Sequence, residues 1–184
     1  MSDTTAQGTA PHATRPWLPP SYGISKAGEG MLSWEHVTAL LKGALNYWIA
    51  TTTQDGRPHV RPVWGAWVDN TLYFDGSPET GWGRNILRDP RISVQVEAGD
   101  EAIIVEGVIV DIPKADDPLV DKLLASCRPK YIPKYNYDHI IEAEGWREHG
   151  LFSLKPSKIL AWNVANFGTS PTRWLFDETK TEEK

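Results

Sequence analysis

The stretch from residue 47 to residue 97 alternates short apolar runs with tight-turn signals. Three segments of it are rich in β-branched and aromatic residues: 47–53, 58–68 and 71–75. The pairs Asp55-Gly56 and Asp69-Asn70 separate these segments. Asp, Asn and Gly tolerate the positive φ that two-residue hairpin turns require. The pattern therefore predicts an antiparallel meander of three strands.

A helix is expected directly after this meander. The polar segment 77–85 leads into Ile86, and Pro90 ends the helix before a fourth strand over 91–97. Small hydroxyl, amide and basic residues gather where the helix begins. A helix N-terminus offers unpaired N–H groups and a partial positive charge, so this turn is a candidate seat for a phosphate group.

The rest of the chain predicts one mainly β domain with short helices. Ser33 is expected to cap a helix that ends near Asn46, and Gly107 to mark a bulge or a close backbone approach inside a strand over 102–112. Six or seven strands with hairpin spacing predict a closed or nearly closed antiparallel barrel. The other expected elements are helices over 118–126 and 139–147, a Pro/Tyr-rich connector over 128–138, and strands over 151–155, 158–163 and 171–176.

We expect three parts in the domain organisation. Residues 1–30 are rich in Thr, Ala, Pro and Gly, which is typical of a flexible arm. Residues 31–176 form the barrel domain, and residues 177–184 form a charged, solvated tail.

Composition excludes several classes of protein. The net charge of −5 and the lack of a Lys/Arg block argue against nucleic-acid binding. The single cysteine, Cys127, fits a reducing compartment. The sequence has neither an apolar run of about 18 residues nor the apolar core of a signal peptide. We therefore expect a cytoplasmic protein without a membrane partner. Nine tryptophans are many for a monomer, so some are expected in a ligand groove or a subunit interface.

No catalytic constellation is visible in the sequence. Paired carboxylates, metal-ligand spacing, a nucleophile elbow and a Rossmann glycine turn are all missing. The tripeptide Gly81-Trp82-Gly83 lacks the third glycine of a dinucleotide fingerprint. The catalytic residues therefore stay unknown, and no metal is expected.

Several residues could instead hold a planar, phosphorylated ligand. Arg61 could bind a phosphate or a ring carbonyl, or form only a surface or interface salt bridge. Ser77 and Thr80 could donate hydroxyls, or serve only the turn and the helix cap. Arg84 and Asn85 fall in the first helical turn, where a bound anion would relieve the conflict between a cation and the helix dipole.

The aromatic residues leave the same two alternatives open. Four tryptophans could enclose a ring, or belong to a core or an interface: Trp64, Trp82, Trp162 and Trp174. Pro62 cannot donate to a strand ladder, so its strand is expected to be an edge strand or to bulge there. His59 is interpreted as a strand surface residue.

The chain resembles the pyridoxamine-phosphate-oxidase-like split-barrel superfamily, and within it the flavin/deazaflavin oxidoreductase branch. The resemblance covers residues 33–112 and 151–176. It rests on these segments: TTTQDGRPHVRPVWG, GSPETGWGRNILRDPRISVQVE, VEG and PTRWLF. It implies a homodimer of six-stranded split barrels with two sites for FMN or the deazaflavin F420 at the interface.

The resemblance also implies roles for single residues. The strand that carries Arg61, Pro62, Val63 and Trp64 would lie along the cofactor ring and phosphate. The turn from Thr80 to Asn85, with Trp82 and Arg84, would hold the phosphate, together with Ser77. The C-terminal strand would approach the site, commonly from the other subunit, through Trp162, Arg173 and Trp174.

Two departures from the family pattern bear on the cofactor. Oxidase members carry an arginine where this chain has Gly81, and a glutamine to the flavin where it has Ala102. A lost bond to a charged phosphate costs about 1.5–3 kcal/mol, which Arg84 or Arg61 could compensate. The departures favour F420 over FMN.

Three functions follow as hypotheses. The first is a flavoprotein oxidoreductase that transfers a hydride between F420 or FMN and a small conjugated substrate, where the cofactor supplies the chemistry. The second is a protein that binds or sequesters a flavin, a deazaflavin or haem without turnover. The third is a dimeric interaction module that has lost its cofactor.

Overall fold

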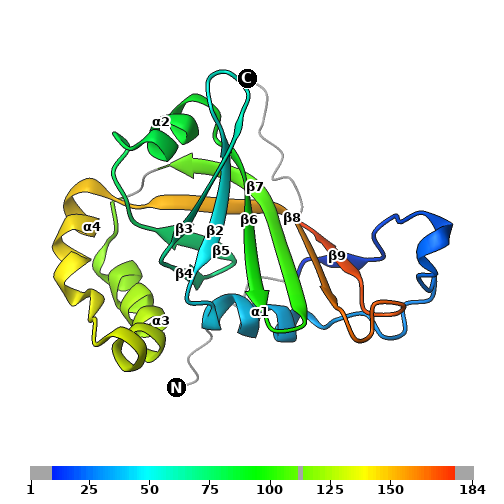
Figure 1. Ribbon diagram of the computed structural model, residues 1–184. Helices are drawn as coiled ribbons and strands as arrows, with labels where there is room; N and C mark the ends of the chain where they lie inside the picture. Colours follow the sequence, from blue (N-terminus) through cyan, green and yellow to red (C-terminus); the bar gives the residue numbers. More distant parts are fainter. Residues whose placement is uncertain (1–9, 112–113, 177–184) are drawn as a thin grey trace, which may run out of the picture.

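An antiparallel sheet of nine strands forms the centre of the molecule (Figure 1). The computed structural model describes residues 10–111 and 114–176. The sheet follows the order β1-β9-β8-β7-β6-β2-β3, while β4 pairs with β5 and β5 pairs with β8. The strands are β1 (His12–Thr14), β2 (Tyr47–Thr52), β3 (Pro58–Val63), β4 (Gly65–Val68), β5 (Thr71–Phe74), β6 (Arg91–Ala98), β7 (Glu101–Asp111), β8 (Phe152–Asn163) and β9 (Thr172–Leu175).

Short helices lie around this sheet. Figure 1 shows α3 and α4 together on one side of the molecule and α2 beside the tip of the β2–β3 hairpin. The mainly β, antiparallel prediction with short flanking helices is confirmed. The helices are η1 (Pro20–Tyr22), α1 (Trp34–Gly43), α2 (Gly81–Arg88), α3 (Asp117–Tyr135), η2 (His139–Glu142) and α4 (Ala143–His149).

The predicted meander is present, with one difference. Asp69 and Asn70 have φ of 49° and 59°, as a two-residue turn between β4 and β5 requires. The segment 58–68, expected as one strand, is divided into β3 and β4 at Trp64. Because β3 pairs with β2 and β4 with β5, this break carries the chain from one part of the sheet to another.

Two clusters of buried side chains hold the fold together. The larger lies between α1 and the inner face of the main sheet and includes Val37, Ile49 and Trp174. The smaller joins β4 to α3 and α4 through residues such as Leu123 and Trp146. At about 25 cal/mol per Å² of apolar area, such burial is the main stabilising term. The second cluster fixes the helical side of the molecule onto the β4–β5 hairpin.

Gly107 confirms the expectation of a bulge with close backbone approach. The register of β7 against β8 shifts between Glu106 and Gly107. A Cβ at Gly107 would stand 2.2 Å from the carbonyl oxygen of Lys155 and 2.8 Å from Cα of Pro156. Both neighbours are backbone atoms that cannot rotate away, so the position needs glycine.

The predicted connector over 128–138 is wrong for most of its length. The helix that begins at Asp117 continues to Tyr135 and contains Pro129 and Pro133. A proline in a helix interior removes a hydrogen bond and costs about 3 kcal/mol. Tertiary contacts offset this cost, because Tyr131 is 0% exposed and its hydroxyl donates to the carbonyl oxygen of Leu45 at 2.9 Å.

Other boundaries also differ from the sequence prediction. Strands expected over 151–155 and 158–163 form one long strand, β8, and α1 ends at Gly43 rather than Asn46. Ser33 caps α1 as expected, since its side chain accepts from the backbone N–H of His36 at 3.1 Å. Within the arm expected over residues 1–30, β1 pairs with β9, while residues 1–9 lie outside the described part. The barrel's closure, the domain boundaries and the tail at 177–184 stay predictions.

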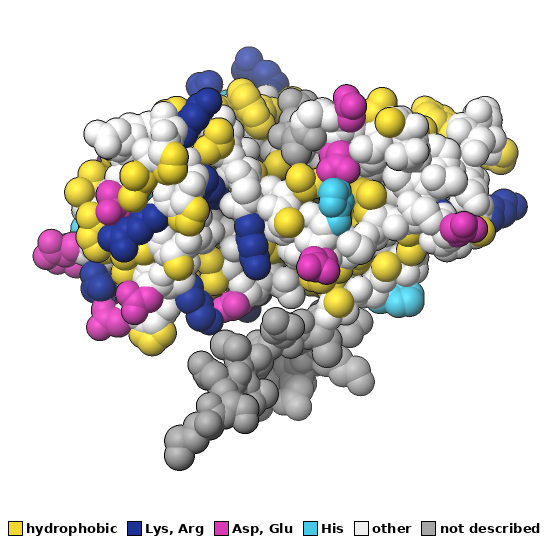
Figure 2. Space-filling view, turned by 90° about the horizontal axis from the view of Figure 1, so that it is seen from below, with side chains coloured by type: hydrophobic (Ala, Val, Ile, Leu, Met, Phe, Trp, Pro, Cys, Tyr) yellow, Lys and Arg dark blue, Asp and Glu magenta, His cyan; other side chains and the backbone are white. Residues whose placement is uncertain are grey.

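The surface mixes charges of both signs. On the face shown in Figure 2, basic, acidic and hydrophobic side chains of the described residues are interspersed. This face therefore carries no extended patch of a single charge. Among the described helices, none combines the length and apolar composition that a membrane crossing needs.

Candidate functional site

The turn that enters α2 is held by hydroxyl groups. Thr80 is the N-cap: its Oγ1 accepts from the backbone N–H of Gly83 at 3.0 Å and donates to the carbonyl oxygen of Ser77 at 2.8 Å. The Oγ of Ser77 accepts from the N–H of Glu79 at 3.1 Å. A Cβ at Gly83 would stand 2.5 Å from the carbonyl oxygen of Ser77, so the turn lies directly against the helix. Both hydroxyls therefore take the structural roles that the sequence left open.

A groove with two arginines lies between α2 and the end of the β2–β3 hairpin. Its volume is about 450 Å³. Arg84 donates to the carbonyl oxygen of Glu79, and Arg88 donates to that of Thr52. Arg84 lies in the first turn of α2 and Arg88 in its last turn; two guanidinium groups in one groove, together with the N–H groups at the start of the helix, favour a bound anion. We call this surface the basic groove; it is lined by Thr53, Gln54, His59, Gly81, Arg84, Asn85 and Arg88.

Asn85 fixes the helix over the hairpin. Its side chain is 6% exposed. Its Nδ2 donates to Oγ1 of Thr51 at 3.1 Å and lies 3.3 Å from Nδ1 of His59. Asn85 thereby sets the distance between α2 and β3, and with it the width of the basic groove.

Strand β3 connects the basic groove to a second cavity. Among the described strands it pairs only with β2, so it is an edge strand there, as the position of Pro62 predicts. Successive side chains of a strand alternate between faces, so His59, Arg61 and Val63 share one face. Arg61 is exposed and has no hydrogen-bond or ion-pair partner among the described residues. Four residues of strand span about 13 Å, so the face can underlie a ligand of that length.

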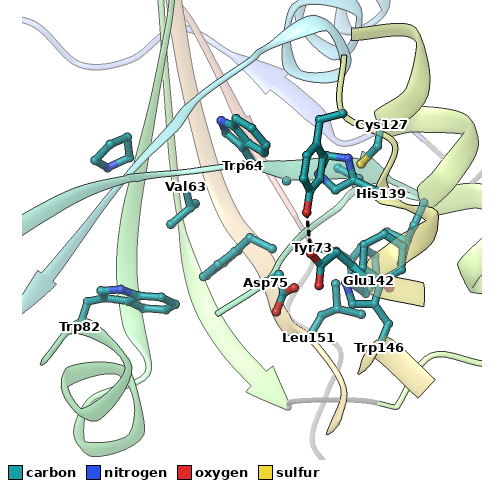
Figure 3. A pocket seen from close by; sticks show the side chains of 16 residues that line it. Val63, Trp64, Tyr73, Asp75, Trp82, Cys127, His139, Glu142, Trp146 and Leu151 are labelled. Carbon is teal, nitrogen blue, oxygen red and sulfur yellow. Dashed lines mark hydrogen bonds between the residues drawn. The ribbon is translucent and has the colours of Figure 1, made fainter. Parts of the chain in front are cut away.

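The second cavity lies where β3 passes into β4 (Figure 3). Its volume is about 330 Å³. Aromatic rings dominate its wall; Trp64, for example, stacks on Tyr131 and Tyr135 with centroids 4.9 Å and 5.1 Å away. We call it the aromatic cavity; its lining is Pro62, Val63, Trp64, Gly65, Ala66, Tyr73, Phe74, Asp75, Trp82, Leu123, Cys127, Tyr137, His139, Glu142, Trp146 and Leu151.

Three residues that line the aromatic cavity, Tyr137, His139 and Cys127, have shifted pKa values. Tyr137 donates to Oε1 of Glu142 at 2.6 Å, and this hydrogen bond raises the pKa of Tyr137 to about 12. Burial lowers the pKa of His139, which favours its neutral form. Burial also raises the pKa of Cys127 to about 11, so its thiol stays protonated and unreactive at neutral pH. The cavity thus offers a phenol, a neutral imidazole and carboxylates.

The comparisons with known proteins decide the family. The family model described as "Pyridoxamine 5'-phosphate oxidase" matches residues 33–163, more than half of the chain. The chain belongs to this family. Among curated proteins, none matches the chain.

Solved structures support the same fold for this pyridoxamine 5'-phosphate oxidase family member. The conserved hypothetical protein Rv2991 from Mycobacterium tuberculosis matches with a TM-score of 0.59 at 18% identity, covering 79% of this chain and 93% of the other. An F420 reductase matches with a TM-score of 0.50 at 22% identity, covering 66% and 93%. An FMN-binding protein from Nostoc punctiforme, related to pyridoxamine 5'-phosphate oxidase, matches with a TM-score of 0.51 at 17% identity, covering 83% and 95%.

Six residues that the sequence proposed for cofactor binding lie in the two cavities. Pro62, Val63, Trp64 and Trp82 line the aromatic cavity, and Arg84 and Asn85 line the basic groove. Arg61 lies between them on β3. Their contacts with a cofactor stay predictions.

Three proposed residues lie elsewhere in the single chain. Trp174 is 1% exposed and packs on Trp34 with ring centroids 5.7 Å apart. Nε of Arg173 donates to Oγ1 of Thr14 at 3.0 Å, and Trp162 meets Phe167 edge-on at 6.3 Å. None of the three lines the basic groove or the aromatic cavity. An approach to the partner subunit's site stays a prediction for them.

The sequence reasoning missed part of the aromatic cavity. Its lining includes four residues that are not among those predicted from the sequence: Tyr137, His139, Glu142 and Trp146. The available signal was the density of aromatic residues over 131–146, but helical spacing there is obscured by Pro133. Arg88 was also missed, although it falls one turn after Arg84 on α2.

The residues present fit a flavin-type cofactor. The basic groove and the start of α2 suit a phosphate, and the edge of β3 offers unpaired backbone groups beside Arg61. Among the described residues, no group of His, Cys, Asp and Glu side chains is arranged to hold a metal ion.

Proposed function

We propose that this chain is an oxidoreductase that binds F420, or alternatively FMN, and exchanges a hydride with a small conjugated substrate. The observation that supports it is the arrangement along β3, where a basic groove and an aromatic cavity lie at opposite ends of the face that carries Arg61. The basic groove suits the anionic tail of such a cofactor, the face of β3 that carries Arg61 suits its flat ring, and the aromatic cavity suits a small substrate beside that ring. The F420 reductase and FMN-binding neighbours agree with this ligand class.

Each surface has its own part in the proposed activity. The cofactor supplies the redox chemistry when bound. Arg84 and Arg88 hold its phosphate, while Arg61 and the edge of β3 orient its ring. Buried aromatic walls exclude water from the reacting centre, which strengthens electrostatic interactions there.

A homodimer is part of this proposal. Trp48 lies opposite Pro62, and Ala50 lies opposite Val60, so these residues share the outer face of the β2–β3 hairpin. Trp48 is 45% exposed and Val60 49% exposed. Neighbouring exposed apolar residues on an edge strand are typical of an interaction surface.

Substituting Val60→Glu is expected to convert a dimer into monomers. A charge buried at an apolar interface is strongly unfavourable. Light scattering after gel filtration should give twice the 20.6 kDa of one chain for the unaltered protein and one chain mass for the variant. Ile141→Glu, which places the same charge at a 67% exposed site on η2, is the control and should leave the mass unchanged. A monomeric unaltered protein would refute the dimer.

Substituting Arg84→Ala is expected to weaken cofactor binding about tenfold or more. A charge-assisted hydrogen bond is worth about 1.5–3 kcal/mol, and 1.4 kcal/mol is a factor of ten. Titrations of FMN and of F420, followed by fluorescence, give the dissociation constants. Arg147→Ala, which removes the same charge from an exposed pair with Asp117 outside both cavities, is the control. Failure of both cofactors to bind below about 100 µM would end the proposal.

A second function is a protein that binds a flavin, a deazaflavin or haem without turnover. Gly81 in place of the usual phosphate-binding arginine favours this alternative, since it weakens one contact without removing the groove. The two functions differ in one measurement. Only the oxidoreductase consumes reduced F420 or FMN, followed by absorbance, when enones, quinones or tetrapyrroles are added.

A further inference from the structure

The aromatic cavity carries charge of one sign. Two carboxylate residues, Asp75 and Glu142, line it, and its described lining contains no lysine or arginine. The basic groove at the other end of β3 has the opposite character, with Arg84 and Arg88. The surface along β3 therefore has a cationic end at the basic groove and an anionic end at the aromatic cavity.

Two cations near the aromatic cavity, Lys130 and Arg128, are tied to other groups. Lys130 is close enough to influence His139, but its Nζ donates to the carbonyl oxygens of Ala44 and Gly65 at 2.9 Å and 2.8 Å. Nε of Arg128 pairs with Asp138 at 3.0 Å. Neither cation lines the cavity, so neither neutralises the carboxylates there.

The cavity wall is a set of fixed π-faces. Besides the stacking of Trp64 on Tyr131 and Tyr135, the Trp64 ring lies 5.4 Å from that of Tyr137 and 5.8 Å from that of His139. Figure 3 shows Trp64 and His139 at the wall of the space, with Glu142 and Asp75 also beside it. Aromatic faces next to carboxylates attract cations, because the ring quadrupole and the negative charge act together.

Two buried polar groups of the lining lack partners. His139 is 7% exposed and Trp146 3% exposed, and neither Nδ1 of His139 nor Nε1 of Trp146 has a hydrogen-bond partner among the described residues. An unsatisfied buried group costs about 1–3 kcal/mol. A neutral imidazole has one donor and one acceptor nitrogen and an indole nitrogen is a donor, so both groups suit polar contents of the cavity. These groups point to a polar ligand rather than an empty apolar void.

We infer that the aromatic cavity is a substrate site that selects planar aromatic cations, such as protonated aryl amines or N-alkylated nitrogen heterocycles. Its volume of about 330 Å³ is near the lower end of small-molecule sites, which suits one or two fused rings. Carboxylates at the wall disfavour aromatic acids of the same size. That the bound cation is a substrate rests on the proposed function, but the preference of the cavity for cations does not.

Three isosteric probes test this preference in the full chain without added cofactor. N-methylquinolinium is the cation, 1-methylnaphthalene the neutral molecule and 1-naphthoate the anion. Quenching of tryptophan fluorescence measures binding, because Trp64 and Trp146 line the cavity. We expect the cation to bind about tenfold more tightly than the neutral probe, and the anion most weakly. Equal affinities for the three probes would overturn the inference.

A matched pair of variants assigns the preference to this cavity. Glu142→Gln keeps an oxygen that accepts from Tyr137 but removes the charge, so N-methylquinolinium should bind about tenfold more weakly, with no change for 1-methylnaphthalene. Glu144→Gln removes a charge from an exposed site on α4 outside the cavity and should change neither affinity. Unchanged cation binding in the first variant would refute the site. If FMN and F420 both fail to bind while the cation preference persists, the proposed function falls and the cation site stands.

Discussion

Replacing Trp174 with alanine is expected to lower the free energy of unfolding by about 3–5 kcal/mol. Trp174 is 1% exposed and lies at the centre of β9, opposite Ile159 on β8 and Ala13 on β1. Its ring packs on Trp34 of α1 at 5.7 Å. Truncation removes this contact and leaves a cavity that three strands and a helix cannot close, because the backbone ladders fix their spacing.

Thermal or urea unfolding followed by circular dichroism measures this loss. For a chain of this length, 1 kcal/mol shifts the melting temperature by about 2–4 °C, so we expect a decrease of roughly 6 to 20 °C. Trp17→Ala is the matched control, because Trp17 is 81% exposed; it should change the free energy by less than about 0.5 kcal/mol. Equal effects of the two substitutions would mean that Trp174 is not a core residue and would support its predicted contact with a ligand.

The strands were predictable where local turn chemistry determines them. Asp69-Asn70 requires positive φ at both positions, and Asp55-Gly56 marks a turn whose ends are fixed by pairing of β2 with β3. The break at Trp64 was not predictable in the same way. It depends on Trp64 packing against Tyr131 and Tyr135, which are more than sixty residues away in the chain.

The longest helix was missed because local and tertiary effects oppose each other there. Pro129 and Pro133 argue against a helix, and a reading by propensity stops before them. Tyr131 lies between them, fully buried, and its hydroxyl lies 3.3 Å from the carbonyl oxygen of Gly65. A contact of this kind has no signature in the sequence of α3 alone.

The two parts of the candidate site also differ in how far the sequence predicts them. The basic groove follows from helix-start chemistry, so Arg84 and Asn85 could be proposed from their position after Thr80. The aromatic cavity is assembled from β3, β4, β5, α2, α3, η2 and α4, so only the fold brings Glu142 and Trp146 to one site. The family resemblance supplied Trp64 and Trp82, but not the acidic character of the cavity.

Lys130 occupies an unusual position for a lysine. Its ammonium donates to the carbonyl oxygens of Ala44 and Gly65 and to the hydroxyl of Tyr47 at 3.2 Å. These three bonds use all three protons, but no carboxylate balances the charge. Desolvation by burial lowers the pKa of Lys130 from 10.5 to about 8.

This pKa makes stability increase with pH over a defined window. Between pH 8 and 10.5 the unfolded chain binds a proton at Lys130 that the folded chain has lost, so raising the pH favours the folded state. The difference between the two pKa values corresponds to about 3 kcal/mol. Groups with raised pKa act in the opposite direction: Cys127 above pH 9, and Tyr47 and Tyr131 above pH 10, because the unfolded chain loses their protons first.

Comparison with Lys130→Met isolates the contribution of the lysine. The free energy of unfolding of the unaltered protein, minus that of the variant, is expected to rise by about 3 kcal/mol between pH 7.5 and 10.5. Urea unfolding at a series of pH values measures it, since effects common to both proteins cancel. Lys122→Met removes an exposed lysine that pairs with Asp69 and should show no such rise, because the pKa of Lys122 is raised rather than lowered. A difference that stays constant with pH would show that burial does not perturb Lys130, and that its three oxygen partners stabilise the ammonium as well as water does.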